Sequence, residues 1–111
     1  MKATVKVSPT LLFEIQTETQ KSMFQELAAL QEVFSNTVCK RCGSEARFVV
    51  RSVDDNDFFE MRCTNEKCRA RLHYGVNKKG ETVFPKRKTD DNKYHAFAGW
   101  MIWDKDAGKE I

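Results

Sequence analysis

The first part of the chain carries two periodic patterns in turn. Residues 2–7 alternate apolar and polar side chains, residues 11–16 have an apolar, β-tolerant composition, and Ser8-Pro9-Thr10 separates them, which predicts a hairpin. From Thr17-x-x-Gln20, which has the form of a capping box, the period becomes helical. The helix should end near Ser35-Asn36, and its apolar stripe comprises Met23, Leu27, Leu30 and Phe34, flanked by Phe24, Ala28 and Val33.

From Cys39 onward the pattern changes to short apolar stretches separated by polar turns. Asp54–Asp57 and Asn77–Gly80 have turn composition, and Pro85 should end a strand. The pattern predicts strands at residues 46–53, 58–62, 71–76 and 81–84, with a late aromatic strand within residues 94–103. Residues 104–111 are predicted to be a frayed tail.

These elements predict an α+β fold: a small antiparallel β zinc ribbon with an N-terminal β-hairpin and one amphipathic helix. The length of 111 residues suits a single domain, residues 1–111. Its expected parts are the hairpin and helix (1–37), the ribbon with added strands (38–88) and an aromatic segment with a tail (89–111). No apolar run is long enough for a membrane span, and no signal peptide is recognisable, so a cytoplasmic protein is expected.

Positive charge is concentrated in the middle of the chain. The net charge is +3, yet 13 of the 19 Lys and Arg residues lie between Cys39 and Lys88, with seven of the 16 Asp and Glu residues. Both ends are mildly acidic. This uneven distribution of charge favours an anionic partner for the central segment.

The four cysteines form two close pairs, Cys39-x-x-Cys42-Gly43 and Cys63-x-x-x-x-Cys68. A hairpin between the pairs would bring both loops to one ion, and Gly43 supplies backbone freedom after the second ligand. Four sulfur ligands favour Zn²⁺ and fill its tetrahedral shell, which predicts one structural zinc. A mononuclear iron or iron–sulfur site, or free buried thiols, are alternatives, and His73 or His95 could replace one sulfur.

The ribbon motif also carries a family resemblance. A Cys-x-x-Cys-Gly run, a hairpin, an aromatic residue and a second cysteine pair resemble the four-cysteine zinc ribbons at the C-terminal end of type IA DNA topoisomerases; the matching residues are Cys39, Cys42, Gly43, Phe58, Cys63 and Cys68. That resemblance implies a module that binds single-stranded DNA, although zinc ribbons also serve as structural or protein-docking modules. The whole chain looks like small phage-encoded proteins of replication and recombination gene clusters, which implies the cytoplasm of a bacterial host.

One strand face is predicted to be basic. Arg47, Val49 and Arg51 share a face of their strand, and Arg69 and Arg71 alternate with apolar residues in the same way. A cationic sheet face with protruding rings suits a single strand, whose phosphates pair with cations while its bases stack on aromatic side chains. The candidate contacts are Arg47, Arg51, Arg69, Arg71, Tyr74, Lys86, Arg87, Lys88 and Trp100, with Phe59, Phe84, Tyr94 and Trp103 as further candidate rings.

The same residues also have structural interpretations. A charged strand face is what any solvated sheet shows, and aromatic side chains in so small a ribbon can be needed for the core. Core positions are expected for Phe24, Phe34, Phe48 and Phe58, and both roles stay open for Tyr74, Trp100 and Trp103.

Catalysis has little support in the sequence. Asp54, Asp55, Asp57, Asp90 and Asp91 fall in predicted turns, there is no phosphate-binding glycine loop, and the cysteines are assigned to metal. We therefore expect a non-catalytic protein that binds nucleic acid, most readily single-stranded DNA. The alternative is an adaptor that docks on a protein through the helix stripe or the acidic tail, with a virus-encoded inhibitor of a host enzyme as a special case.

Overall fold

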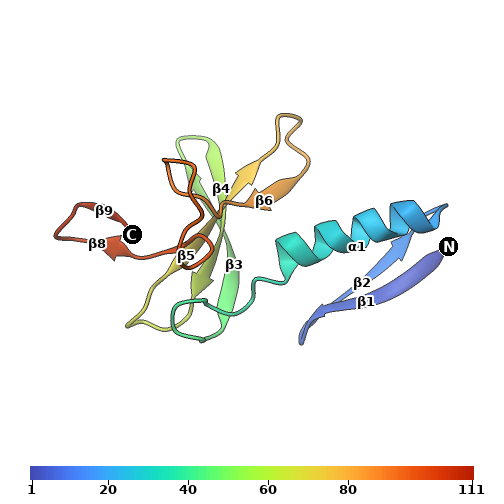
Figure 1. Cartoon of the computed structure of the whole chain (residues 1–111), viewed down its shortest axis with the longest axis horizontal. Helices are drawn as coiled ribbons and strands as arrows, with labels where there is room; N and C mark the ends of the chain where they lie inside the picture. Colours follow the sequence, from blue (N-terminus) through green and yellow to red (C-terminus); the bar gives the residue numbers. More distant parts are fainter. The chain divides into compact units, whose positions relative to one another are not determined.

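The computed structural model describes all 111 residues, which divide into two compact units, Met1–Asn36 and Thr37–Ile111 (Figure 1). The chain has one helix and several antiparallel sheets, which confirms the small α+β class. The helix is too short and too polar to cross a membrane. The first unit ends one residue before the expected end of the N-terminal part, at residue 37, and the single domain of residues 1–111 stays a prediction.

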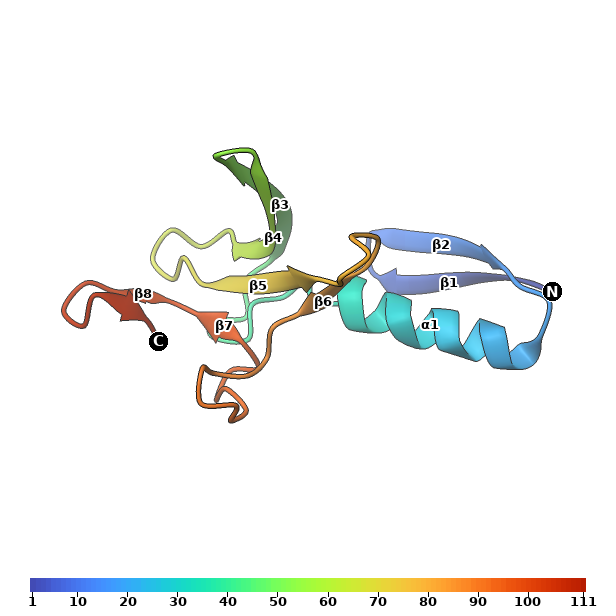
Figure 2. The same cartoon turned by 90° about the horizontal axis from the view of Figure 1, so that it is seen from above.

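The first unit is a hairpin with a helix packed on it (Figure 2). Strands β1 (Lys2–Ser8) and β2 (Leu11–Gln16) pair antiparallel and place alternate side chains toward α1 (Gln20–Phe34), whose Met23 is buried. The rings of Phe13 and Phe34 lie 5.1 Å apart between centroids. The apolar stripe of the helix is therefore confirmed, but Phe24 is 77% exposed and the expectation of a core position for it is wrong.

The helix begins at a different cap from the one expected. The backbone of Thr17 exchanges hydrogen bonds with Met1, and this pairing extends the hairpin instead of opening the helix. The Oγ1 atom of Thr19 accepts from the backbone N–H of Ser22 at 3.0 Å, so Thr19 is the N-cap.

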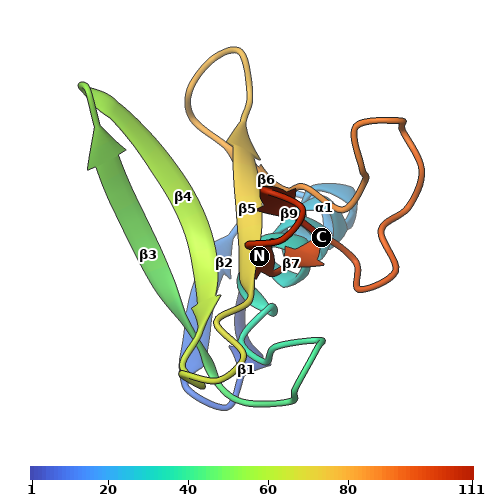
Figure 3. The same cartoon turned by 90° about the vertical axis from the view of Figure 1, so that its left-hand side faces the viewer.

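The second unit is built on a five-stranded antiparallel sheet, whose strands β3, β4 and β5 lie side by side in Figure 3. Its order is β3-β4-β5-β6, with β7 also paired to β5; the strands are β3 (Ala46–Val53), β4 (Asn56–Cys63), β5 (Arg71–Val76), β6 (Val83–Pro85) and β7 (Trp100–Met101). Asp54 and Asp55 both have positive φ (50° and 65°) and form a tight two-residue turn, shorter than predicted. The Oδ1 atom of Asn77 accepts from the N–H groups of Glu81 and Thr82, so these two residues belong to the turn and β6 begins at Val83 instead of residue 81.

The register gives the sheet two different faces. Met61, Leu72 and Trp100 lie opposite one another across β4, β5 and β7 and are fully buried, so they form the core. Phe48 points to the same face but lies on the edge strand β3, where it stays 51% exposed. Phe58 lies on the other face, opposite Arg51, and is 44% exposed. The core positions predicted for these two phenylalanines are therefore wrong.

The C-terminal segment is ordered, and the prediction of a frayed tail is wrong. Strands β8 (Trp103–Asp104) and β9 (Lys109–Glu110) form a hairpin, which reciprocal backbone hydrogen bonds between Ile102 and Ile111 close at 3.0 and 2.9 Å. The hairpin follows directly on β7 and extends beyond it (Figure 2). Before β7, Gly99 has φ +98°, and a Cβ atom there would lie 2.0 Å from the carbonyl oxygen of Lys86.

Candidate metal centre and cationic groove

The four cysteine sulfurs converge as the spacing predicts. All four Sγ atoms lie within 4.8 Å of one another. The Cys39–Cys68 and Cys42–Cys63 sulfur pairs are 3.8 and 3.4 Å apart, and no disulfide joins them. A tetrahedral zinc ion with bonds of about 2.3 Å needs sulfur separations of about 3.8 Å. The arrangement therefore fits one tetrahedral metal ion, and it is consistent with a zinc ribbon.

Local backbone geometry presents each pair of sulfurs. In the first turn, Gly43 adopts φ +80° and donates its N–H to the carbonyl oxygen of Cys39 at 2.9 Å, as expected for the glycine after the second ligand. The N–H of Arg41 donates to the Cys39 sulfur at 3.4 Å, and that of Asn65 donates to the Cys63 sulfur at the same distance. Such N–H donors offset negative charge on thiolates.

The thiols have opposed acidities. Hydrogen bonds from Ser44 lower the pKa of Cys42 to about 6, whereas burial raises the pKa of Cys63 to about 12. Burial also raises the pKa of Cys68. Four thiolates can lie this close only when a cation balances their charge, so metal binding must release protons from the buried cysteines.

Neither histidine belongs to the sulfur cluster. The Nδ1 atom of His95 accepts from the N–H groups of Phe97 and Gly99 at 3.0 and 3.3 Å, and burial, aided by the nearby Arg41, lowers its pKa. His73 lies on the arginine-bearing face of the sheet. The four cysteines form the cluster without either ring.

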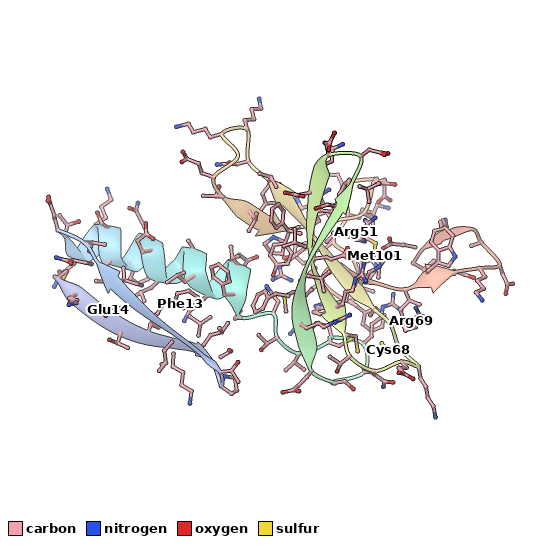
Figure 4. The ribbon with its side chains drawn as sticks, turned by 180° about the vertical axis from the view of Figure 1, so that it is seen from behind. Phe13, Glu14, Arg51, Cys68, Arg69 and Met101 are labelled. Carbon is pink, nitrogen blue, oxygen red and sulfur yellow. The ribbon has the colours of Figure 1, made fainter.

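A groove of about 830 Å³ adjoins the second cysteine pair. Its walls come from β3, β4, the Thr64–Arg69 loop, β5 and the C-terminal hairpin, and Glu66 is the only acid among the lining residues. Figure 4 labels Cys68 and Arg69 at this end of the sheet and Arg51 farther along it. The cationic groove is lined by Arg47, Arg62, Lys67, Arg69, Arg71 and Lys105, together with Trp103.

The structure separates the predicted nucleic-acid contacts into groups. Arg47, Arg69 and Arg71 line the groove. Arg51 lies outside it, with its guanidinium carbon 4.9 Å from the centroid of the Phe58 ring. Three further residues also lie outside: Lys86 and Lys88 are exposed, and Arg87 donates to the carbonyl oxygen of Ala98 at 3.1 Å.

Two predicted stacking rings belong to the core. Trp100 is fully buried and Tyr74 is 8% exposed, because the pairing of β5 with β6 and β7 covers them. Neither ring has a face available for a base, which corrects the expectation of stacking. Trp103 is 53% exposed and lines the groove, and it was among the candidate rings.

Sequence reasoning missed Lys105 and the acids that organise the arginine-bearing face. Glu60 has no exposed side-chain surface, and its Oε1 atom accepts from both Nε and Nη2 of Arg62 at 2.5 Å. Its Oε2 atom is 3.4 Å from Nδ1 of His73, and Arg51 Nε is 3.9 Å from Oε1. Glu110 contacts the other ring nitrogen of His73. The register opposite His73 would have revealed Glu60, but no local signal points to Glu110.

No protein-family model matches the chain, and no curated protein or solved structure matches it either. The function is therefore inferred from the geometry of the chain itself.

Proposed function

We propose that this chain is a non-catalytic zinc-ribbon protein that binds single-stranded nucleic acid, DNA in the first place, along the cationic groove. The observation that supports it most is the groove itself, where six cationic side chains and one acidic side chain share one cavity. Phosphates of a single strand would pair with these cations and release counterions. An accessory role in phage DNA replication or recombination is proposed only from the resemblance of the chain to small phage-encoded proteins.

The exposed ring favours a single strand over a duplex. Trp103 lines the same groove as the cations, so an unstacked base can lie on the ring while its phosphate meets a guanidinium or ammonium group. Bases in a duplex are stacked on one another and cannot use the ring in this way. The proposed contacts are Arg47, Arg62, Lys67, Arg69, Arg71 and Lys105 for phosphates and Trp103 for a base.

The metal has a structural role in this proposal. Four soft sulfur donors select Zn²⁺, and four thiolates leave no open position for a substrate or an activated water. The ion would fix the Thr64–Arg69 loop, which carries two cations of the groove. Lys67 lies between the third and fourth ligands, and Arg69 directly follows the fourth. We therefore propose no reaction at the metal.

The test is fluorescence anisotropy of labelled single-stranded DNA, duplex DNA and RNA with zinc-loaded protein at two salt concentrations. We expect salt-sensitive binding that prefers the single strand, and quenching of tryptophan emission. Lys105→Gln should weaken binding about threefold, whereas Lys109→Gln, on the same hairpin but outside the groove, should not. Trp103→Ala should weaken it about tenfold or more. Binding that does not change with salt, or equal effects of the two lysine variants, would contradict the proposal.

A second candidate function is docking on a protein, and one observation favours it. Phe24 on α1 is 77% exposed, on a side of the helix that β1 and β2 do not cover. An apolar side chain at such a position can contact a partner. A pull-down that survives nuclease treatment and is lost in Phe24→Ser, with Gln25→Ser as the matched exposed control, would support docking. Equal recovery with both variants would contradict it.

A further inference from the structure

The C-terminal hairpin places a carboxylate on the cationic face of the sheet. The two Oε atoms of Glu110 lie 3.0 and 2.9 Å from Nε2 of His73, and its Oε1 atom is 3.5 Å from Nη2 of Arg71. These three side chains are 23%, 27% and 29% exposed, so water and solutes reach the contact. Arg71 is also a lining residue of the cationic groove. One arginine is therefore shared between the groove and Glu110.

We propose that Arg71 and His73 form a phosphate-binding position that continues the groove, and that Glu110 occupies this position in the free protein. This proposal rests on the proposed function, because it describes how Glu110 would regulate nucleic-acid binding at the same groove. A carboxylate and a phosphate diester accept from the same donors, so nucleic acid and Glu110 compete for them. The C-terminal hairpin thereby lowers the affinity of the groove.

The two acids that face His73 differ in their ability to leave. Glu60 approaches Nδ1, is fully enclosed, and is held by Arg62 through two short contacts. Moving the Glu60 carboxylate away from Arg62 would leave its buried charge unpaired. Glu110 approaches Nε2, keeps part of its side chain in solvent, and comes from a two-residue strand. Only Glu110 is therefore placed to exchange with an incoming anion.

The exchange needs little movement of the backbone. The C-terminal end of the hairpin is held separately, because Nη2 of Arg41 donates to the carbonyl oxygen of Ile111 at 2.6 Å. The hairpin also stays closed through its backbone bonds between Ile102 and Ile111. Rotation of the Glu110 side chain alone frees Arg71 and His73. Trp103 and Lys105 can keep their places in the groove wall during this exchange.

The test compares Glu110→Gln with Asp106→Asn in anisotropy titrations with labelled single-stranded DNA. Both variants remove one negative charge from the same hairpin, but Asp106 is an exposed residue of the hairpin turn and lines no part of the groove. We expect Glu110→Gln to bind about fivefold tighter than the wild type and Asp106→Asn to bind less than about twofold tighter. The slope of log K against log salt should steepen by about 0.7 in Glu110→Gln alone, since one more cation becomes free for a phosphate.

A second pair of variants tests whether the effect passes through Arg71. In an Arg71→Gln background, Glu110→Gln should gain no more affinity than Asp106→Asn does. A thermal melt of each variant establishes that it is folded before binding is compared. Wild-type protein that fails to bind at low salt would overturn the proposed function. Salt-sensitive wild-type binding with equal effects of Glu110→Gln and Asp106→Asn would overturn the competition alone.

Discussion

The buried carboxylate of Glu60 allows a quantitative test of how the arginine-bearing face is stabilised. We consider Glu60→Gln, which preserves the shape of the side chain and removes its charge. In the wild type this carboxylate balances the charges of Arg62 and Arg51, lies 3.4 Å from Nδ1 of His73, and has no exposed side-chain surface. The amide oxygen of the variant can still accept from Arg62, so the variant isolates the effect of the charge.

The expected loss follows from the burial of the partners. Removing one member of a fully buried ion pair costs about 3–5 kcal/mol. The cationic partners here are partly hydrated, with side chains of Arg62 and Arg51 30% and 41% exposed, so solvent screens part of the unpaired charge. We therefore expect Glu60→Gln to lower the free energy of unfolding by about 2 kcal/mol.

The assay is urea unfolding of the zinc-loaded protein at neutral pH, followed by tryptophan emission. Both tryptophans, Trp100 and Trp103, lie in the second unit and report on its unfolding. Urea is chosen because it does not screen charge as guanidinium chloride does. Glu81→Gln is the matched control, since Glu81 is exposed and makes no ion pair; its change should stay within about 0.5 kcal/mol. Equal stability of the two variants would refute the stabilising role of Glu60.

Three further predictions address the metal, a close backbone approach at Gly99 and the half-buried His95. Cys63→Ser should reduce bound zinc from one ion per chain and unfold the second unit, as judged by metal analysis and tryptophan emission; an unchanged cooperative melt would exclude a structural metal. Gly99→Ala should destabilise the fold by about 2–4 kcal/mol in urea, because its Cβ would lie 2.0 Å from the Lys86 carbonyl oxygen at φ +98°. Burial lowers the pKa of His95 below 6.5, so the unfolded chain binds a proton on this ring more readily than the folded chain does. The stability that the neutral ring allows is therefore present above about pH 6.5 and is lost as the pH falls. His95→Gln should therefore lose less stability than the wild type between about pH 6.5 and 5.5, and parallel pH profiles would contradict this.

Local sequence patterns were sufficient to predict the strands of the β1–β2 and β3–β4 hairpins, the stripe of the helix and the sulfur cluster, but not the C-terminal β8–β9 hairpin. Their signals are periodicity and spacing, which do not depend on distant parts of the chain. The common face of Arg47 and Arg51 follows from the alternation of side chains along one strand and agrees with the register of β3 and β4. These features could be derived before any tertiary arrangement was known.

The predictions that were wrong depend on which segments become neighbours. Trp100 is buried because β7 pairs with β5, and Phe48 stays exposed because β3 is an edge strand of the sheet. The composition of a strand does not reveal which strand it will pair with or whether it will lie at an edge. Glu110 reaches His73 across 37 positions of sequence, and an acidic residue near a chain end resembles an ordinary solvated tail until that contact is seen.

The tight turn at Asp54-Asp55 has a consequence for the order of events during folding. A hairpin with a two-residue turn closes in microseconds, and the register of β3 and β4 places Ala46 opposite Cys63. Closure therefore carries the third ligand back to the first cysteine turn without help from later segments. All four ligands have left the ribosome once residue 68 is free, before β5 is complete. The four sulfurs can thus converge on a metal ion while the chain is still being synthesised, and an ion bound at that stage would hold the end of β4 before β5 pairs with it.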